Sequence, residues 1–68
     1  MNIENLINEY RQRLSDHETM RDAEQEALRA ARRLGDTDIE LATRRAEVRR
    51  RNDLIQLCTQ IIKDLESL

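Results

Sequence analysis

The stretch Leu34-Gly35-Asp36-Thr37-Asp38-Ile39-Glu40 decides how this chain folds. Its glycine, the single one in the sequence, can adopt the left-handed conformation that ends a helix. Thr37 followed three residues later by Glu40 is a capping box, which begins a new helix. A helix end and a helix start separated by two or three residues are typical of an antiparallel helix pair. The stretch therefore predicts a turn at about residues 35–37.

Helix-forming residues fill the sequence on both sides of this turn. Arg, Glu, Ala, Leu and Gln dominate from about residue 3 to 34 and again from about 38 to 66, and proline is absent. Asn2 is the predicted N-cap of the first helix. We expect an all-α fold, a single domain over residues 1–68 that forms an antiparallel two-helix hairpin.

Length and composition exclude several classes of protein. The 68 residues fall below the ~70–80 at which one core usually suffices without a disulfide, a metal or a partner subunit. A single cysteine excludes an internal disulfide, and apolar runs of at most two residues exclude a membrane span. The polar start MNIENL is unlike a signal peptide, so we expect a cytoplasmic protein that does not bind membranes.

Apolar residues in the second helix cover more than one of its faces. From Leu54 onward they are Leu54, Ile55, Leu57, Cys58, Ile61, Ile62, Leu65 and Leu68. One neighbouring helix buries a single stripe, so a second stripe, which includes Ile55 and Ile62, needs another partner. We expect a homodimer in which two hairpins form a four-helix bundle, or burial against a different protein.

The register of the hairpin follows from the position of the turn. Facing residues have numbers that sum to about 71, which sets the first apolar residues of helix one against the last of helix two. The same pairing brings Asp22 toward Arg49 and Glu26 toward Arg45. Such exposed pairs are worth only ~0–1 kcal/mol each, so they set register more than stability.

The sequence carries no catalytic or metal-binding pattern. His17 and Cys58 are the single residues of their types, and the pairing separates them. Paired cysteines, an HExxH string, a calcium loop and a glycine-rich phosphate loop are all absent. We interpret Cys58 as a small buried hydrophobe and His17 as a boundary residue paired with Asp53. The expectation is a protein that is not an enzyme and uses no cofactor.

Five arginines in eight residues form the strongest local charge feature, Arg44-Arg45-Ala46-Glu47-Val48-Arg49-Arg50-Arg51. Arginine forks suit phosphate oxygens, so the cluster is one argument for nucleic-acid binding. Against it stand the net charge of −2 and the absence of aromatic residues between the arginines. Binding to an acidic protein and simple salt-bridged solvation are the other two interpretations.

The layout resembles three families of small helical hairpins. A charged first helix, a central turn (Arg-Arg-Leu-Gly-Asp, residues 32–36) and an aliphatic end to the second helix (residues 55–65) resemble type III secretion needle co-chaperones. Phage-encoded helical-hairpin inhibitors of bacterial regulators are similar in size and charge. The plasmid copy-number regulator that binds RNA as a dimeric four-helix bundle is similar in architecture. These resemblances imply a bacterial or phage adaptor that works by occupying surfaces.

The functional expectation is therefore a non-enzymatic regulator that docks helix surfaces on an unidentified partner protein to inhibit or chaperone it. The alternative is a dimeric four-helix-bundle regulator that binds RNA or DNA through the Arg44–Arg51 cluster. The expected partner-binding or dimer face consists of Tyr10, Leu14, Leu54, Ile55, Cys58 and Ile62. The expected charged surface that selects a partner consists of Arg21, Glu24, Arg45, Arg49 and Arg50.

Overall fold

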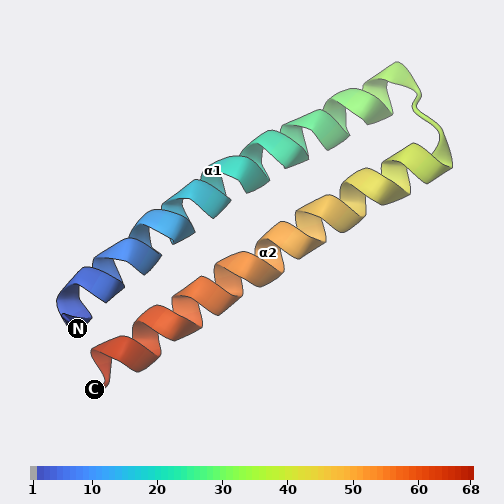
Figure 1. Ribbon diagram of the computed structural model, residues 1–68. Coiled ribbons are helices and arrows are strands. Elements are labelled where there is room, and N and C mark those ends of the chain that lie inside the picture. Colours follow the sequence, from blue (N-terminus) through green and yellow to red (C-terminus); the bar gives the residue numbers. More distant parts are fainter. Residues whose placement is uncertain (1) are drawn as a thin grey trace.

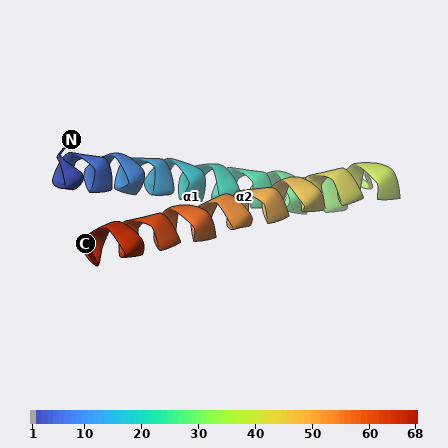
Figure 2. The ribbon, with the colours of Figure 1, turned by 60° about the horizontal axis from the view of Figure 1, so that its bottom comes forward.

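Two helices make up the computed structural model, which describes residues 2–68: α1 (Ile3–Leu34) and α2 (Asp38–Glu66). The start of α1 lies beside the end of α2 (Figure 1), and the two helices are inclined at a shallow angle (Figure 2). The molecule is a rod 49 Å long and 14 Å across. Within residues 2–68 there is no strand, which confirms the prediction of an all-helical chain with two packed helices.

The helix ends form as the sequence predicts. The Asn2 side chain accepts from the backbone N–H of Glu4 at 2.9 Å. Gly35 is left-handed, with φ at 78°, and the Asp36 N–H reaches back to the Ala31 carbonyl at 3.0 Å. The left-handed conformation of Gly35 turns the chain so that backbone N–H groups after the helix can donate to carbonyl groups that the end of α1 would otherwise leave unpaired.

The capping box of α2 is complete on both sides. The Thr37 hydroxyl accepts from the Glu40 N–H at 3.2 Å, and the Glu40 carboxylate accepts from the Thr37 N–H at 3.3 Å. Because these contacts are local, the turn residues alone determine where α1 stops and α2 begins.

The two helices pack along one seam with alternating spacings of three and four residues, the pattern of a coiled coil. On α1 the seam comprises Ile3, Ile7, Tyr10, Leu14, His17, Arg21, Glu24, Leu28 and Ala31. On α2 it comprises Leu41, Arg44, Val48, Arg51, Ile55, Cys58, Ile62 and Leu65. The aliphatic layers lie near the chain ends and near the turn, and charged residues occupy the middle.

The resulting core is thin. Among residues 2–68 the apolar side chains that are largely shielded from solvent are Ala31, Cys58 and Ile62, at 4%, 6% and 8% exposed. Two helices can shield each other only along one line, so the remaining seam residues stay half-buried, apart from Ile3, which is exposed. Neither α1 nor α2 has a stretch long and apolar enough to cross a membrane.

Candidate functional site

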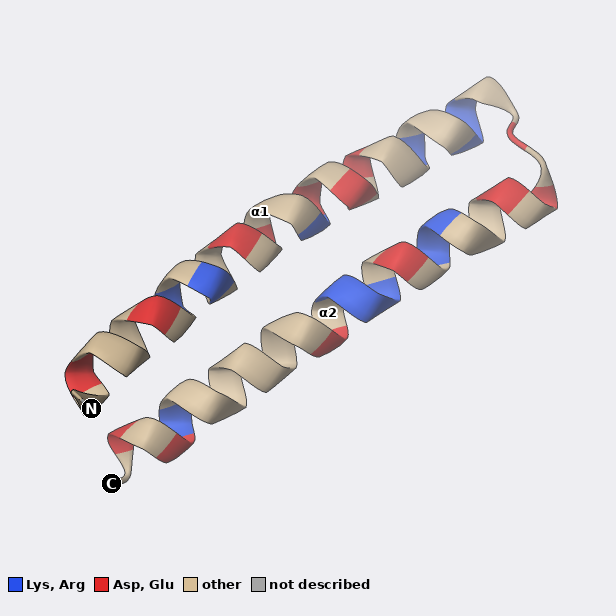
Figure 3. Ribbon diagram, viewed as in Figure 1, with Lys and Arg blue, Asp and Glu red and all other residues tan. Residues whose placement is uncertain are grey.

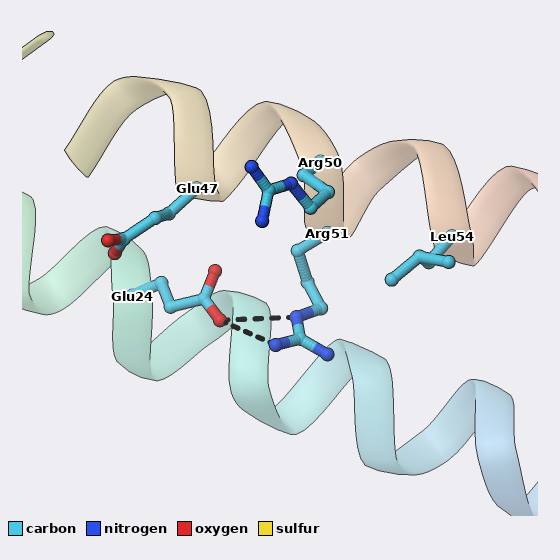
Figure 4. Close-up of a pocket in the computed structure, with 5 residues that line it drawn as sticks. All are labelled: Glu24, Glu47, Arg50, Arg51 and Leu54. Atoms are coloured by element: carbon cyan, nitrogen blue, oxygen red, sulfur yellow. Dashed lines mark hydrogen bonds and ion pairs between the residues drawn. The ribbon is translucent and has the colours of Figure 1, made fainter. Parts of the chain in front are cut away.

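A polar layer interrupts the seam halfway along the rod. It consists of His17 and Glu24 from α1 and Arg51 from α2. Arg51 donates from Nε and Nη2 to the Glu24 Oε1 atom at 3.1 and 3.0 Å (Figure 4). Its Nη1 lies 2.8 Å from Nδ1 of His17. A guanidinium has no acceptor, so His17 must accept this bond at Nδ1 and carry its own proton on Nε2.

The second oxygen of Glu24 is left without a partner. The side chains of Glu24 and Arg51 are 18% and 23% exposed, and Oε2 of Glu24 is buried with no hydrogen bond. It borders a shallow hollow of about 280 Å³ lined by Glu24, Glu47, Arg50, Arg51 and Leu54. In Figure 4 the side chains of Glu47 and Arg50 extend from α2 above Glu24, which puts both signs of charge at the rim.

The seam agrees with the predicted register. Arg51 reaches Glu24 in one direction along α1 and His17 in the other, so its level on α1 lies between them, near Arg21. The predicted pairing of His17 with Asp53 is wrong, because the Arg51 side chain reaches along the seam to His17 and donates to its Nδ1 atom.

The two predicted cross-helix charge pairs do not form either. Asp22 lies 3.3 Å from Arg21 and Glu26 lies 2.8 Å from Arg29, each on its own helix. Asp22, Glu26, Arg45 and Arg49 all lie outside the seam and are exposed, so these side chains meet solvent and not the facing helix.

The five-arginine cluster does not form a single basic surface. Arg51 is held in the polar layer, and Arg44 lies 3.5 Å from Asp36 at the turn. The exposed members are Arg45, Arg49 and Arg50. Arg50 borders the hollow, whereas Arg45 and Arg49 lie on the other side of α2. Neutralised and divided in this way, the cluster offers few adjacent cations to a phosphate backbone.

The residues expected on the partner-binding face mostly lie in the seam. Tyr10, Leu14 and Ile55 are half-buried there, and Cys58 and Ile62 are buried. The assignment of Ile55 and Ile62 to the outward stripe is therefore wrong, because both face α1. Of the six expected residues, Leu54 lies outside the seam, beside the hollow. Tyr10 also stacks under Arg13, whose guanidinium carbon is 4.9 Å from the ring centre.

The outward apolar surface is made by other residues. Leu54, Glu47 and Glu24 border one hollow and so lie on the same side of the rod. Steps of three, four or seven residues along a helix stay on one side. A second hollow that shares Glu47 adds Ile39. This side, which we name the apolar flank, carries Leu6, Met20, Ala27, Leu34, Ile39, Leu54, Leu57, Ile61 and Leu68.

The apolar flank holds most of the exposed aliphatic side chains. Met20, Leu34, Ile39, Leu57 and Leu68 are 48%, 82%, 81%, 56% and 84% exposed, and Ile3 at the start of the seam is the sixth such residue within 2–68. The stretch 54–62 contains no charge and appears as the tan part of α2 in Figure 3. A second heptad stripe through Leu54, Leu57 and Ile61 was the sequence signal for this surface.

Within the described part of the chain, no three His, Cys, Asp or Glu side chains gather in a way that could hold a metal ion. Cys58 is a free thiol buried in the seam. The main features that the described residues present are an apolar flank and a polar layer beneath its centre.

Comparisons with known proteins give no match. No protein-family model, no curated protein and no solved structure matches this chain.

Proposed function

We propose that this chain is a non-enzymatic protein-binding regulator, an antiparallel hairpin that docks helix surfaces on a partner protein to inhibit or chaperone it. The observation that carries the proposal is the apolar flank. Five large aliphatic side chains about half exposed or more lie on one side of a rod that has little core of its own. Large aliphatic side chains exposed together on one side of a protein are typical of a protein-docking site.

The docking mode follows from the shape of this surface. The flank runs along two parallel ridges of side chains, which suits another helix laid lengthwise between or beside them. Leu54, Leu57 and Ile61 would supply buried apolar area. Glu47 and Arg50, at the rim of the hollow, would favour a partner with charges of both signs in matching positions.

The rival function, binding of RNA or DNA through the Arg44–Arg51 cluster, has less support. Two of the five arginines are paired within the hairpin, and the other three point to two different sides. Arg45 and Arg49 lie on the side of α2 away from the hollow. Their charges suit a supplementary contact with an acidic segment of a partner protein.

The proposal is tested by site-specific photo-crosslinking in the cell that naturally makes the protein. A photoreactive residue replaces Leu57 on the apolar flank or, as matched control, its neighbour Gln56, which is exposed on another face. We expect an adduct with a different protein from position 57, none from position 56, and loss of the adduct when Ile61→Glu is added. Absence of any such adduct from position 57, or equal adducts from both positions, contradicts the proposal.

A further inference from the structure

The two sides of the rod differ in their content of aliphatic side chains. The ion pair between Arg11 and Glu66 marks the side opposite the apolar flank. Steps of seven residues from these two define a polar flank without a single aliphatic side chain: Glu4, Arg11, Glu18, Gln25, Arg32, Asp38, Arg45, Asn52, Thr59 and Glu66. A hairpin that met solvent on both sides would have no reason for this asymmetry. One side is built to stay in water and the other is built to be covered.

The exposed area indicates the size of the missing cover. The chain has an accessible surface of 5217 Å². A compact monomer of 8.1 kDa has about 4,500 Å², so the excess is about 700 Å². A standard protein interface covers about 800 Å² on each partner. The excess is therefore about the area that one ordinary interface covers on each partner.

The charges on the apolar flank permit contact with an identical surface. Glu47 and Arg50 are one acid and one base near the middle of the rod, and Glu9 and Arg13 form an ion pair of 2.6 Å on the same side. A flank with one sign of charge would repel its own copy, whereas this one carries both signs. In a two-fold dimer each flank meets the same flank, so an acid and a base within the patch can each face the opposite charge of the second copy.

We infer that the resting occupant of the apolar flank is a second copy of this chain, and that two hairpins pack flank to flank as a four-helix bundle. The inference rests on the docking surface of the proposed function and names its first partner. A chain with so thin a core needs its cover from the moment it folds, and its own copy is always present in equal amount. A target protein then has to compete with the second copy for the flank.

The test is the solution mass of the purified full chain, measured by light scattering over a dilution series together with helical circular dichroism. We expect about twice 8.1 kDa at micromolar concentration, and a joint fall of mass and ellipticity on strong dilution. Leu57→Glu on the apolar flank should raise the dimer dissociation constant by more than about a hundredfold, because each dimer loses two buried leucines. Gln56→Glu, which adds the same charge on another face, should leave the dimer intact.

The remaining outcomes are equally decisive. A fully helical monomer at every concentration overturns the inference, as does a dimer that survives Leu57→Glu but is lost with Gln56→Glu. If Leu57→Glu unfolds the chain, dilution of the unaltered protein still decides, since only a dimer loses helix content with dilution. A monomer that nonetheless yields a heterologous adduct in cells retains the proposed function without this inference. A dimer that yields no heterologous adduct in cells retains this inference and contradicts the proposed function.

Discussion

Replacing Arg51 by Met tests whether the polar layer is an energetically coupled unit. The substitution removes two hydrogen bonds to Glu24 and one to His17, and leaves the Glu24 carboxylate unpaired at 18% exposure. Breaking a fully buried ion pair costs about 3–5 kcal/mol, and a charged hydrogen bond contributes about 1.5–3 kcal/mol. Because both side chains retain some solvent, we expect a loss of about 2–3 kcal/mol in the free energy of unfolding.

The double variant Glu24→Leu with Arg51→Met should regain the stability that Arg51→Met alone loses. Two apolar residues of similar size fill the layer without an orphaned charge, so the stability should return to within about 1 kcal/mol of the unaltered chain or exceed it. Glu24→Leu alone should cost only about 1–1.5 kcal/mol, since the long Arg51 side chain can turn toward water. The double-mutant cycle over these variants should then give a coupling free energy of about 3 kcal/mol between Glu24 and Arg51.

The assay is urea unfolding followed by circular dichroism, with all variants at one protein concentration so that association contributes equally. The exposed pair Glu26 and Arg29, 2.8 Å apart on α1 and outside the apolar flank, is the control, and its removal should cost less than about 0.5 kcal/mol. If the double variant in the polar layer loses the sum of the two single losses, the layer is not a coupled unit and the reasoning is refuted.

Three further predictions follow from the core, the cap and the arginines. Because Ile62 is 8% exposed, Ile62→Ala should lower the free energy of unfolding in urea titrations by about 2–4 kcal/mol, and Ile62→Val by about 0.5–1.5 kcal/mol. Small and equal losses for the two variants would contradict the position of Ile62 in the seam. Thr37→Ala should cost about 1 kcal/mol through the lost capping box, whereas Thr43→Ala, which removes only a hydroxyl bond to a backbone carbonyl, should change stability by less than about 0.5 kcal/mol in the same titrations. Arg49→Gln with Arg50→Gln should leave any retardation of RNA or duplex DNA in gels unchanged; a steep salt-dependent retardation that these changes abolish would revive the nucleic-acid function.

The ends of the helices were predictable from the sequence because their causes are local. Gly35 is the residue that can take a left-handed φ without strain, and Thr37 and Glu40 bond to each other across one turn. Each of these contacts spans three residues or fewer. The residue types at those positions therefore determine the bounds of α1 and α2 without help from the rest of the chain.

The side-chain partners and the outward stripe were not predictable in the same way. The turn places Arg51 opposite residues near 20, but so long a side chain can reach one turn in either direction, so the sequence alone does not show that it bonds to Glu24 and His17. Ile61 and Ile62 are adjacent and chemically identical, and only packing shows that Ile62 faces α1. The polar layer was missed because charged residues in a seam are indistinguishable in sequence from a solvated face.

The buried thiol of Cys58 has a consequence for following the motion of this molecule. It is the single cysteine of the chain and lies between the helices at 6% exposed. A thiol reagent can reach it only when α1 and α2 separate at that level, so the labelling rate reports the frequency of local opening. The labelling rate of Cys58 in the unaltered protein therefore measures how often the two helices separate at that level, both before and after a partner binds.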